Sequence, residues 1–171
     1  MRIEYLLAAA LLVGSTAGHG SDAKSGRTID AAAAFSRLKT LAGEWEADTK
    51  EGKVHVSYEV VAGGTSLMER ESSDKMPLML TLFYVNGERL LLTHYCMAGN
   101  QPRMQAKRFD AGTGEIEFQF LDATNLTTPD AGHMHNASFH FTDDKHFQAE
   151  WQFYENGKLK FAENAQYTRV R

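Results

Sequence analysis

The chain has 171 residues, of which 43% are apolar and 23% are charged, and these values are typical of a globular protein with a core of its own. The formal net charge is -4, and the 18 Lys and Arg residues form no basic stripe, so the charge pattern does not favour a nucleic-acid partner. No segment supplies the roughly 20 consecutive apolar residues that a transmembrane helix needs. Composition therefore excludes a disordered chain and a multi-span membrane protein.

The first 17 residues have the outline of a secretory signal peptide. Arg2 gives a positive start, residues 6–13 are apolar, and small residues follow at 15–17. We expect cleavage near Ala17 and export to the periplasm or the exterior; the alternative is a frayed amphipathic N-terminus. Residues 18–29 are polar and rich in Gly and Ser, which predicts a flexible lead-in to a domain over residues 30–171.

One short helix is predicted after this lead-in. Asp30 can cap its N-terminus, an alanine run follows, and Phe35, Leu38 and Leu41 fall on one face. Gly43 stands where a helix commonly ends. The helix has one apolar face, so we expect it to lie over a larger element.

All segments after Gly43 have the pattern of short strands separated by turns. Asn86-Gly87 between two apolar runs predicts a hairpin, and Asn156-Gly157 predicts another. The expected strands are 45–48, 54–60, 66–71, 78–85, 90–97, 104–109, 116–121, 133–141, 147–154 and 159–170. We predict an all-β fold of nine or ten strands, a closed or nearly closed antiparallel up-and-down barrel with the helix over one end. An open two-sheet sandwich is the alternative.

Two parts of the sequence resemble known families. Leu41-Ala42-Gly43-Glu44-Trp45, a helix that runs into Gly-x-Trp, is similar to the entry of lipocalin-like (calycin) barrels. The segment 92–104, together with 122–125 and 133–134, resembles a large group of uncharacterised exported bacterial proteins over residues 35–171. That resemblance implies a lipocalin-like fold and no particular activity. A more distant similarity to nitrobindin-type barrels would imply a haem held by a histidine near the barrel end, and none of the seven histidines is assigned that role.

A dense polar cluster follows the apolar run 90–93 and contains most of the candidate ligand-binding residues. Leu90 and Leu92 share a strand face with His94 and Cys96, so both polar side chains are expected to point into the barrel. The opposite orientation, with Leu91 inward, stays open. The loop that follows offers amide and guanidinium donors at the expected barrel mouth, unless these groups satisfy their own turn. The candidates are His94, Tyr95, Asn100, Gln101, Arg103 and Trp151.

Both tryptophans are expected in the barrel interior. Trp45 should close the barrel floor, and Trp151 should stack with Phe147 and Phe153 on one strand face. An inward Trp151 could also contact a ligand.

Three residues are candidate metal ligands. His133 and His135 stand at i and i+2 and share a strand face with Phe139 and Phe141, so they point inward if the phenylalanines do. With Cys96 as a third ligand they could hold a metal ion. The alternative is that these histidines satisfy backbone groups or lie in solvent.

The function that we predict is an exported barrel that holds a small apolar or amphipathic molecule. No Gly-x-Ser-x-Gly, His-Glu-x-x-His or phosphate-loop motif is present, so no catalytic residue is assigned. One alternative is a haem- or metal-binding protein or an enzyme that uses His94, Cys96, His133 or His135. The other is a structural or partner-binding barrel. The sequence names no cofactor and no oligomeric state.

Overall fold

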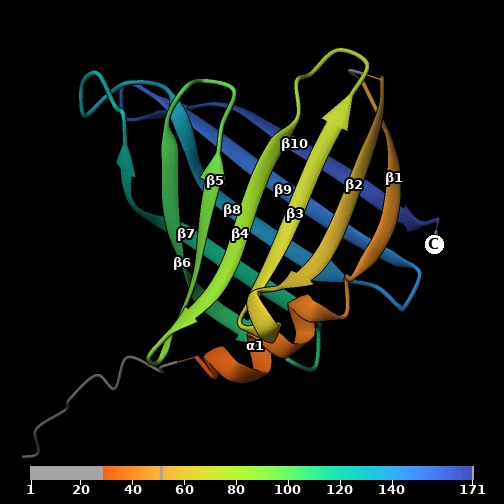
Figure 1. Ribbon diagram of the computed structural model, residues 1–171. Coiled ribbons are helices and arrows are strands. Elements are labelled where there is room, and N and C mark those ends of the chain that lie inside the picture. The colour runs from red at the N-terminus through yellow and green to blue at the C-terminus, as the bar shows by residue number, and fades with distance from the viewer. Residues whose placement is uncertain (1–28, 51, 171) are drawn as a thin grey trace, which may run out of the picture.

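The protein is a closed antiparallel barrel in a computed structural model that describes residues 29–50 and 52–170. Within these residues ten strands form the barrel, and each pairs with the next along the chain until the last meets the first (Figure 1). The predicted all-β up-and-down barrel is therefore confirmed, and the sandwich alternative is wrong. The predicted signal peptide and the lead-in, apart from residue 29, lie outside the described residues.

The secondary structure follows the predicted order. The strands are β1 (Gly43–Thr49), β2 (Gly52–Val61), β3 (Ser66–Ser73), β4 (Met79–Asn86), β5 (Arg89–Tyr95), β6 (Gln101–Asp110), β7 (Glu115–Thr124), β8 (His133–Phe141), β9 (His146–Glu155) and β10 (Lys158–Arg169). The helix is α1 (Ala31–Lys39), and a short 3-10 turn, η1 (Ala62–Gly64), joins β2 to β3. Closure is made by β1 and β10, which pair Trp45 with Arg169 and Glu46 with Thr168.

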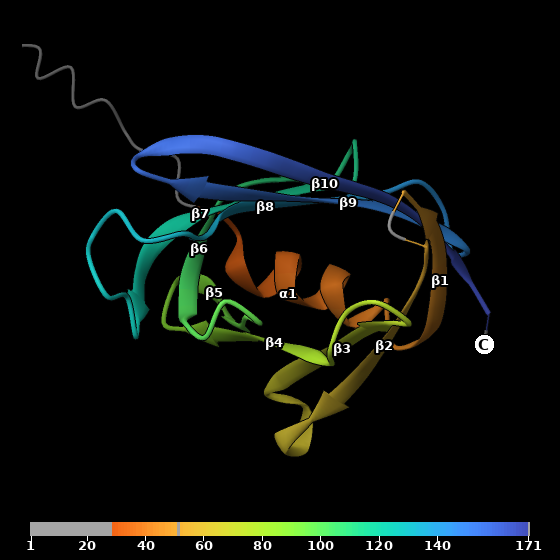
Figure 2. The same cartoon turned by 90° about the horizontal axis from the view of Figure 1, so that it is seen from above.

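Helix α1 lies across one end of the barrel, within the ring of strands when seen from above (Figure 2). Asp30 caps it by accepting a hydrogen bond from the backbone amide three residues on, and Leu38 is fully buried. The helix ends at Lys39 with Thr40 as its C-cap, so the prediction that Gly43 ends it is wrong. Gly43 is instead the first residue of β1, where its φ of 132° favours glycine. No helix in the described part of the chain is long and apolar enough to cross a membrane.

Trp45 and Arg169 join the two ends of the domain at the barrel floor. The Trp45 side chain is buried, as predicted, and its indole Nε1 donates to the Leu41 carbonyl at 2.7 Å. The Arg169 guanidinium lies over the Trp45 ring, 4.1 Å from its centroid. It also donates to the carbonyl oxygens of Thr40 and Ala42 at 2.8 Å. The last strand is thus fastened to the segment that links α1 to β1.

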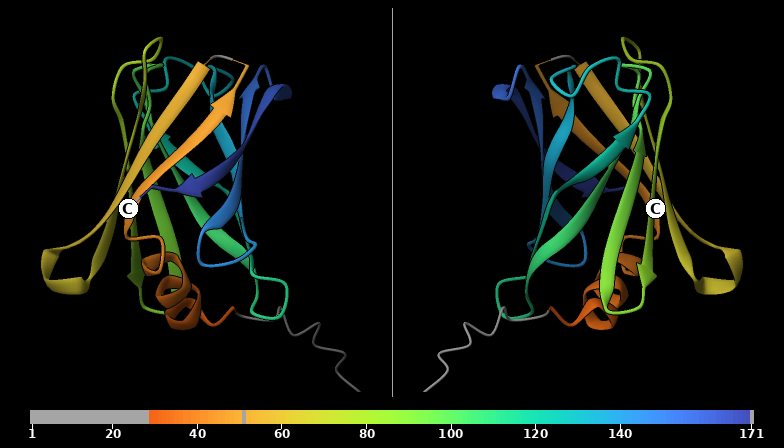
Figure 3. Two further views of the ribbon diagram at one scale, coloured as in Figure 1. Left: turned by 90° about the vertical axis from the view of Figure 1, so that its right-hand side faces the viewer. Right: turned by 90° about the vertical axis from the view of Figure 1, so that its left-hand side faces the viewer.

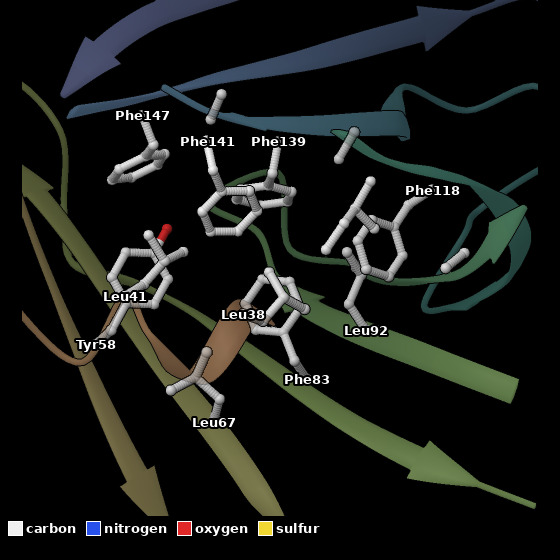
Figure 4. Packing of buried hydrophobic residues seen from close by; sticks show 14 of the residues in the cluster. Leu38, Leu41, Tyr58, Leu67, Phe83, Leu92, Phe118, Phe139, Phe141 and Phe147 are labelled. Atoms are coloured by element: carbon white, nitrogen blue, oxygen red, sulfur yellow. The ribbon is translucent and has the colours of Figure 1, made fainter. Parts of the chain in front are cut away.

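An aromatic layer fills the interior next to α1. Phe83, Phe118 and Phe139 pack edge to face, with ring centroids 5.6 to 6.1 Å apart. Figure 4 shows these rings around Leu38 of the helix, with Leu92 beside Phe118. Burying several large side chains in one layer is the main source of stability for a fold of this kind. The packed part of the barrel is therefore the half that α1 closes.

Candidate functional site

A row of four polar side chains crosses the barrel interior beside the aromatic layer. Tyr58, Glu69, Thr81 and His94 lie opposite one another on the successive strands β2 to β5, and all four are buried. The Tyr58 hydroxyl donates to Glu69 Oε2 at 2.5 Å, and the Thr81 hydroxyl donates to Glu69 Oε1 at 2.8 Å. His94 Nδ1 lies 3.0 Å from Thr81 Oγ1. The row is a continuous hydrogen-bonded chain, which we call the polar row.

The polar row fixes the protonation state of His94. The single hydroxyl proton of Thr81 goes to Glu69, so Nδ1 of His94 carries a proton and donates it to Thr81 Oγ1. Nε2 of His94 is then an acceptor, and it is buried without a hydrogen-bond partner among the described residues. Burial lowers the pKa of His94 to about 4, so the ring is neutral at neutral pH.

A cavity of about 520 Å³ lies at the end of the barrel away from α1, between β9 and β10 on one side and β1 to β3 on the other. Figure 3 shows this end from two sides, with the turns between strands around it. The walls are mostly apolar and aromatic, and two carboxyl side chains contribute to them. The lining includes Val54, Glu71, Met76, Trp151, Glu163 and Tyr167.

Glu71 connects the cavity to the polar row. It follows Glu69 by two residues on β3, so both side chains point to the interior. Its side chain is only 9% exposed, and the carboxyl forms no hydrogen bond or ion pair with another described residue. Burial, and then the nearby charges of Glu69 and Glu163, raise the pKa of Glu71 to about 8. Glu71 is therefore mostly protonated in the empty cavity at neutral pH.

Two of the predicted ligand-binding residues are at this site. Leu90, Leu92 and His94 all face inward, and His94 is 2% exposed. Trp151 lines the cavity, and the His94 ring lies against it with a centroid distance of 5.0 Å. The inward orientation of His94, left open by the sequence, is thereby settled. Cys96 is half-buried at the edge of the core.

The ring partners of Trp151 differ from those predicted. Phe147 and Phe153 do lie on the same side of β9 as Trp151. However, the rings in contact with Trp151 are those of His94 and Phe139, which come from other strands. Alternate residues on one strand are too far apart to stack, so neighbouring strands supply the partners.

Three other predicted ligand-binding residues do not line the cavity. Tyr95 is exposed at the end of β5. The Arg103 guanidinium makes two hydrogen bonds to the Asp122 carboxylate on the exposed surface. Gln101 accepts a hydrogen bond from the Thr124 hydroxyl at 2.5 Å. The polar groups of Arg103 and Gln101 are thus used in cross-strand contacts.

Asn100 connects two loops at the same end of the barrel. It is buried, and its Nδ2 donates to the Gly132 carbonyl at 2.8 Å, so the turn after β5 is held against the segment before β8. Its Oδ1 is buried without a partner among the described residues. Asn100 thus positions the end of the barrel and is not part of the cavity wall.

The two candidate metal ligands of β8 contact each other. His133 Nε2 lies 3.0 Å from His135 Nδ1, and His133 Nδ1 lies 2.7 Å from the Ala131 carbonyl. The rings of Phe120 and Tyr154 stack on His135 at 4.8 and 4.4 Å. This arrangement is an aromatic cluster at the start of the strand.

The predicted three-residue metal set is not assembled in this structure. Over residues 29–50 and 52–170 no three His, Cys, Asp or Glu side chains lie close enough together to hold a metal ion, so Cys96 does not join the two histidines. The register shifts between Met134 and Asn136, so a bulge interrupts the alternation that related His133 to Phe139. Met134 joins the apolar core beside the shift.

The sequence analysis missed several residues of the site, among them Tyr58, Glu69, Glu71, Thr81, Glu163 and Tyr167. The alternation in β3 places Leu67 on one face with two glutamates, a pattern that is typical of an exposed face. The missing signal was on the neighbouring strand, where Val54 and Val56 share an apolar face with Tyr58. Pairing that face with β3 would have placed Glu69 in the interior.

Comparison with known proteins supports the fold and nothing finer. No protein-family model matches the chain, and no curated protein matches it. The crystal structure of Rv2717c from M. tuberculosis is similar, with a TM-score of 0.56 and 17% sequence identity. The match covers 81% of this chain and 98% of that chain. The lipocalin-like and nitrobindin-type resemblances stay predictions.

Proposed function

We propose that this protein binds a small, partly apolar molecule in the barrel cavity. The observation that carries the proposal is the cavity itself, a space of about 520 Å³ with aromatic walls and a buried carboxyl group that faces it. Sites for small molecules typically measure roughly 300–1,000 Å³ and combine apolar walls with few polar groups. Since α1 closes the other end, we expect entry between the β1–β2 turn and the β3–β4 loop, which supply Lys50 and Met76.

Export of the mature protein is part of this proposal. It is supported by the positive start, apolar run and small residues of the first 17 positions. Mass spectrometry of protein expressed with this segment should find a mature N-terminus near residue 18. A mature chain that retains its first residues would contradict export by this route.

Dye uptake tests whether the cavity is a binding site. A neutral fluorescent dye such as Nile red should bind the protein and brighten as it leaves water. Ala165→Trp would place an indole in the cavity, because Ala165 lines it beside Ala149 on the neighbouring strand. We expect this variant to bind the dye at least tenfold more weakly. The matched control is Ala111→Trp, in an exposed turn, which should bind like the parent.

Two results would contradict the proposal. One is dye uptake by Ala165→Trp equal to that of the parent. The other is no uptake by the parent, together with no molecule that co-purifies with it in native mass spectrometry.

A further inference from the structure

Building on the proposed function, we propose that the cavity selects small organic cations, whose ammonium group pairs with the Glu71 carboxylate while an apolar body lies against Trp151 and Tyr167.

Glu71 is a buried carboxyl group that lacks a partner within the described residues. Two residues away, Glu69 is also buried, and it accepts hydrogen bonds from Tyr58 and Thr81. Burial of a polar group without a hydrogen bond costs free energy, and the fold avoids that cost at Glu69. At Glu71 the carboxyl group faces the cavity instead, so a ligand is in a position to supply the missing donor.

The charges that face the cavity favour a cation. Glu71 comes from β3 and Glu163 from β10, and Glu69 is two residues from Glu71 on the same face of β3. The basic side chain among the lining residues is Lys50, which is exposed at the rim. Two carboxyl groups therefore lie along the wall where the ligand would be held, and an anionic ligand would be repelled there.

Aromatic rings line the same space. Trp151 and Tyr167 come from the neighbouring strands β9 and β10. Other rings hold both in place: Tyr167 stacks on Phe147 at 4.7 Å, and Trp151 lies against His94. The face of an aromatic ring attracts an ammonium group, and the ring also covers an apolar body. The Glu71 carboxyl group and the two aromatic rings are therefore complementary to a ligand that carries an ammonium group on an apolar chain.

Binding of a cation should release a proton from Glu71. The pKa of Glu71 is about 8 in the empty cavity, and an adjacent ammonium group favours the charged carboxylate. Affinity should therefore rise roughly tenfold per pH unit below pH 8 and level off above it.

Several titratable groups besides Glu71 lie near the cavity. They are Lys50 after β1, Tyr58 on β2, Glu69 on β3, His94 on β5, Cys96 after β5, and Glu163 and Tyr167 on β10. Burial raises the pKa values of both tyrosines and of the Cys96 thiol and lowers that of His94, so these four groups keep one protonation state between pH 6 and 8. Changes of affinity in this range therefore report on the glutamates.

The test uses three ligands that share one chain and differ in their heads: octylammonium, octanol and octanoate. Isothermal titration calorimetry on the full chain at pH 8 should show octylammonium binding at least tenfold more tightly than either of the others. At pH 6 the preference should fall by tenfold or more. Titrations in two buffers with different ionisation enthalpies should show a proton released on binding at pH 7.

Glu71→Gln keeps the shape of the side chain and removes its charge. We expect it to bind octylammonium no more tightly than octanol. Glu59→Gln is the matched control, because Glu59 is exposed on the outer face of β2. Should Glu71→Gln fail to fold, the pH profile and the proton release of the parent decide the question alone.

The outcomes separate the inference from the proposed function. Equal binding of octanol and octylammonium, or tightest binding of octanoate, would overturn cation selection and leave the binding function standing. No binding of any of the three ligands would overturn both.

Discussion

Glu71 and His94 are both buried in their uncharged forms, and they affect stability in opposite directions. The pKa of Glu71 is raised from 4.5 to about 8, so its contribution to stability is complete below pH 4.5 and is lost as the pH rises to about 8. The pKa of His94 is lowered from 6.5 to about 4, so its contribution is complete above pH 6.5 and is lost as the pH falls to about 4. The two slopes oppose each other between pH 4.5 and pH 6.5, and of the two only that of the glutamate remains above pH 6.5.

These pKa values predict how stability changes with pH above pH 6.5. The free energy of unfolding of the parent should fall by about 1–2 kcal/mol between pH 6.5 and pH 8, since each pH unit contributes at most about 1.4 kcal/mol per group. Glu71→Gln should remove most of this fall, and Glu59→Gln should preserve it. Urea unfolding at both pH values measures the change. An unchanged slope in Glu71→Gln would show that another group is responsible.

Thr81 is the central link of the polar row, because it contacts both Glu69 and His94. Thr81→Val keeps the shape and leaves two buried polar atoms without partners. We expect a loss of about 2–4 kcal/mol in the free energy of unfolding. Thr93→Val is the control: Thr93 is half-buried, with a long contact of 3.4 Å to the Tyr84 hydroxyl, and should lose less than about 1 kcal/mol. Equal losses in the free energy of unfolding would show that the hydrogen bonds of the polar row stabilise the fold no more than the contact of Thr93 does.

At the scale of elements, Arg169 fastens β10 to the segment that follows α1. Arg169→Met removes the guanidinium that lies over Trp45, together with its hydrogen bonds to the carbonyl oxygens of Thr40, Ala42 and Asp144. We expect a loss of about 1–3 kcal/mol in the free energy of unfolding. Arg108, whose ion pairs lie on the exposed outer surface, is the control, and Arg108→Met should change stability by less than about 0.5 kcal/mol. A loss at residue 169 no larger than this would contradict the role of Arg169.

The strands and turns could be predicted because their signals are local. Alternation along 54–60 and the dipeptides at 86–87 and 156–157 act within one strand or one hairpin. The bulge at His135 could not be predicted, because it depends on the register against β9. Nor could the end of α1, which stops at Lys39 before a turn and leaves Gly43 to start β1.

The candidate site depends on contacts between strands, which explains why the sequence indicated only part of it. His94 was found because two leucines on its own strand marked the inward face. Glu69 and Glu71 were missed because the partners of this face, Tyr58 and Thr81, are 11 and 12 residues from Glu69. Arg103 was predicted as a ligand-binding residue from its guanidinium chemistry alone. In the structure this guanidinium donates to the Asp122 carboxylate on the neighbouring strand.

At the scale of the whole molecule, closure removes the free edges that an open sheet would expose. The seam is short: β1 and β10 pair Trp45 with Arg169 and Glu46 with Thr168, and the Val170 amide donates to the Glu44 carbonyl. By contrast, β8 and β9 pair along most of their length. We predict that amide protons at the seam exchange with solvent before those of β8 and β9. Hydrogen exchange followed by NMR tests this. Uniform protection around the barrel would show that the seam is as stable as the rest.

The polar row also has a consequence for how the chain assembles. A shift of one residue between two of its strands would turn a carboxyl group to the outside, and a shift of two would set Glu69 opposite Met79 or Phe83, without the Thr81 hydroxyl. Apolar side chains can exchange neighbours at little cost in free energy. A carboxyl group that is buried without a hydrogen-bond partner carries a large cost. Residues 58, 69, 81 and 94 therefore single out one alignment of four consecutive strands, and misaligned forms are disfavoured before the last strand closes the ring.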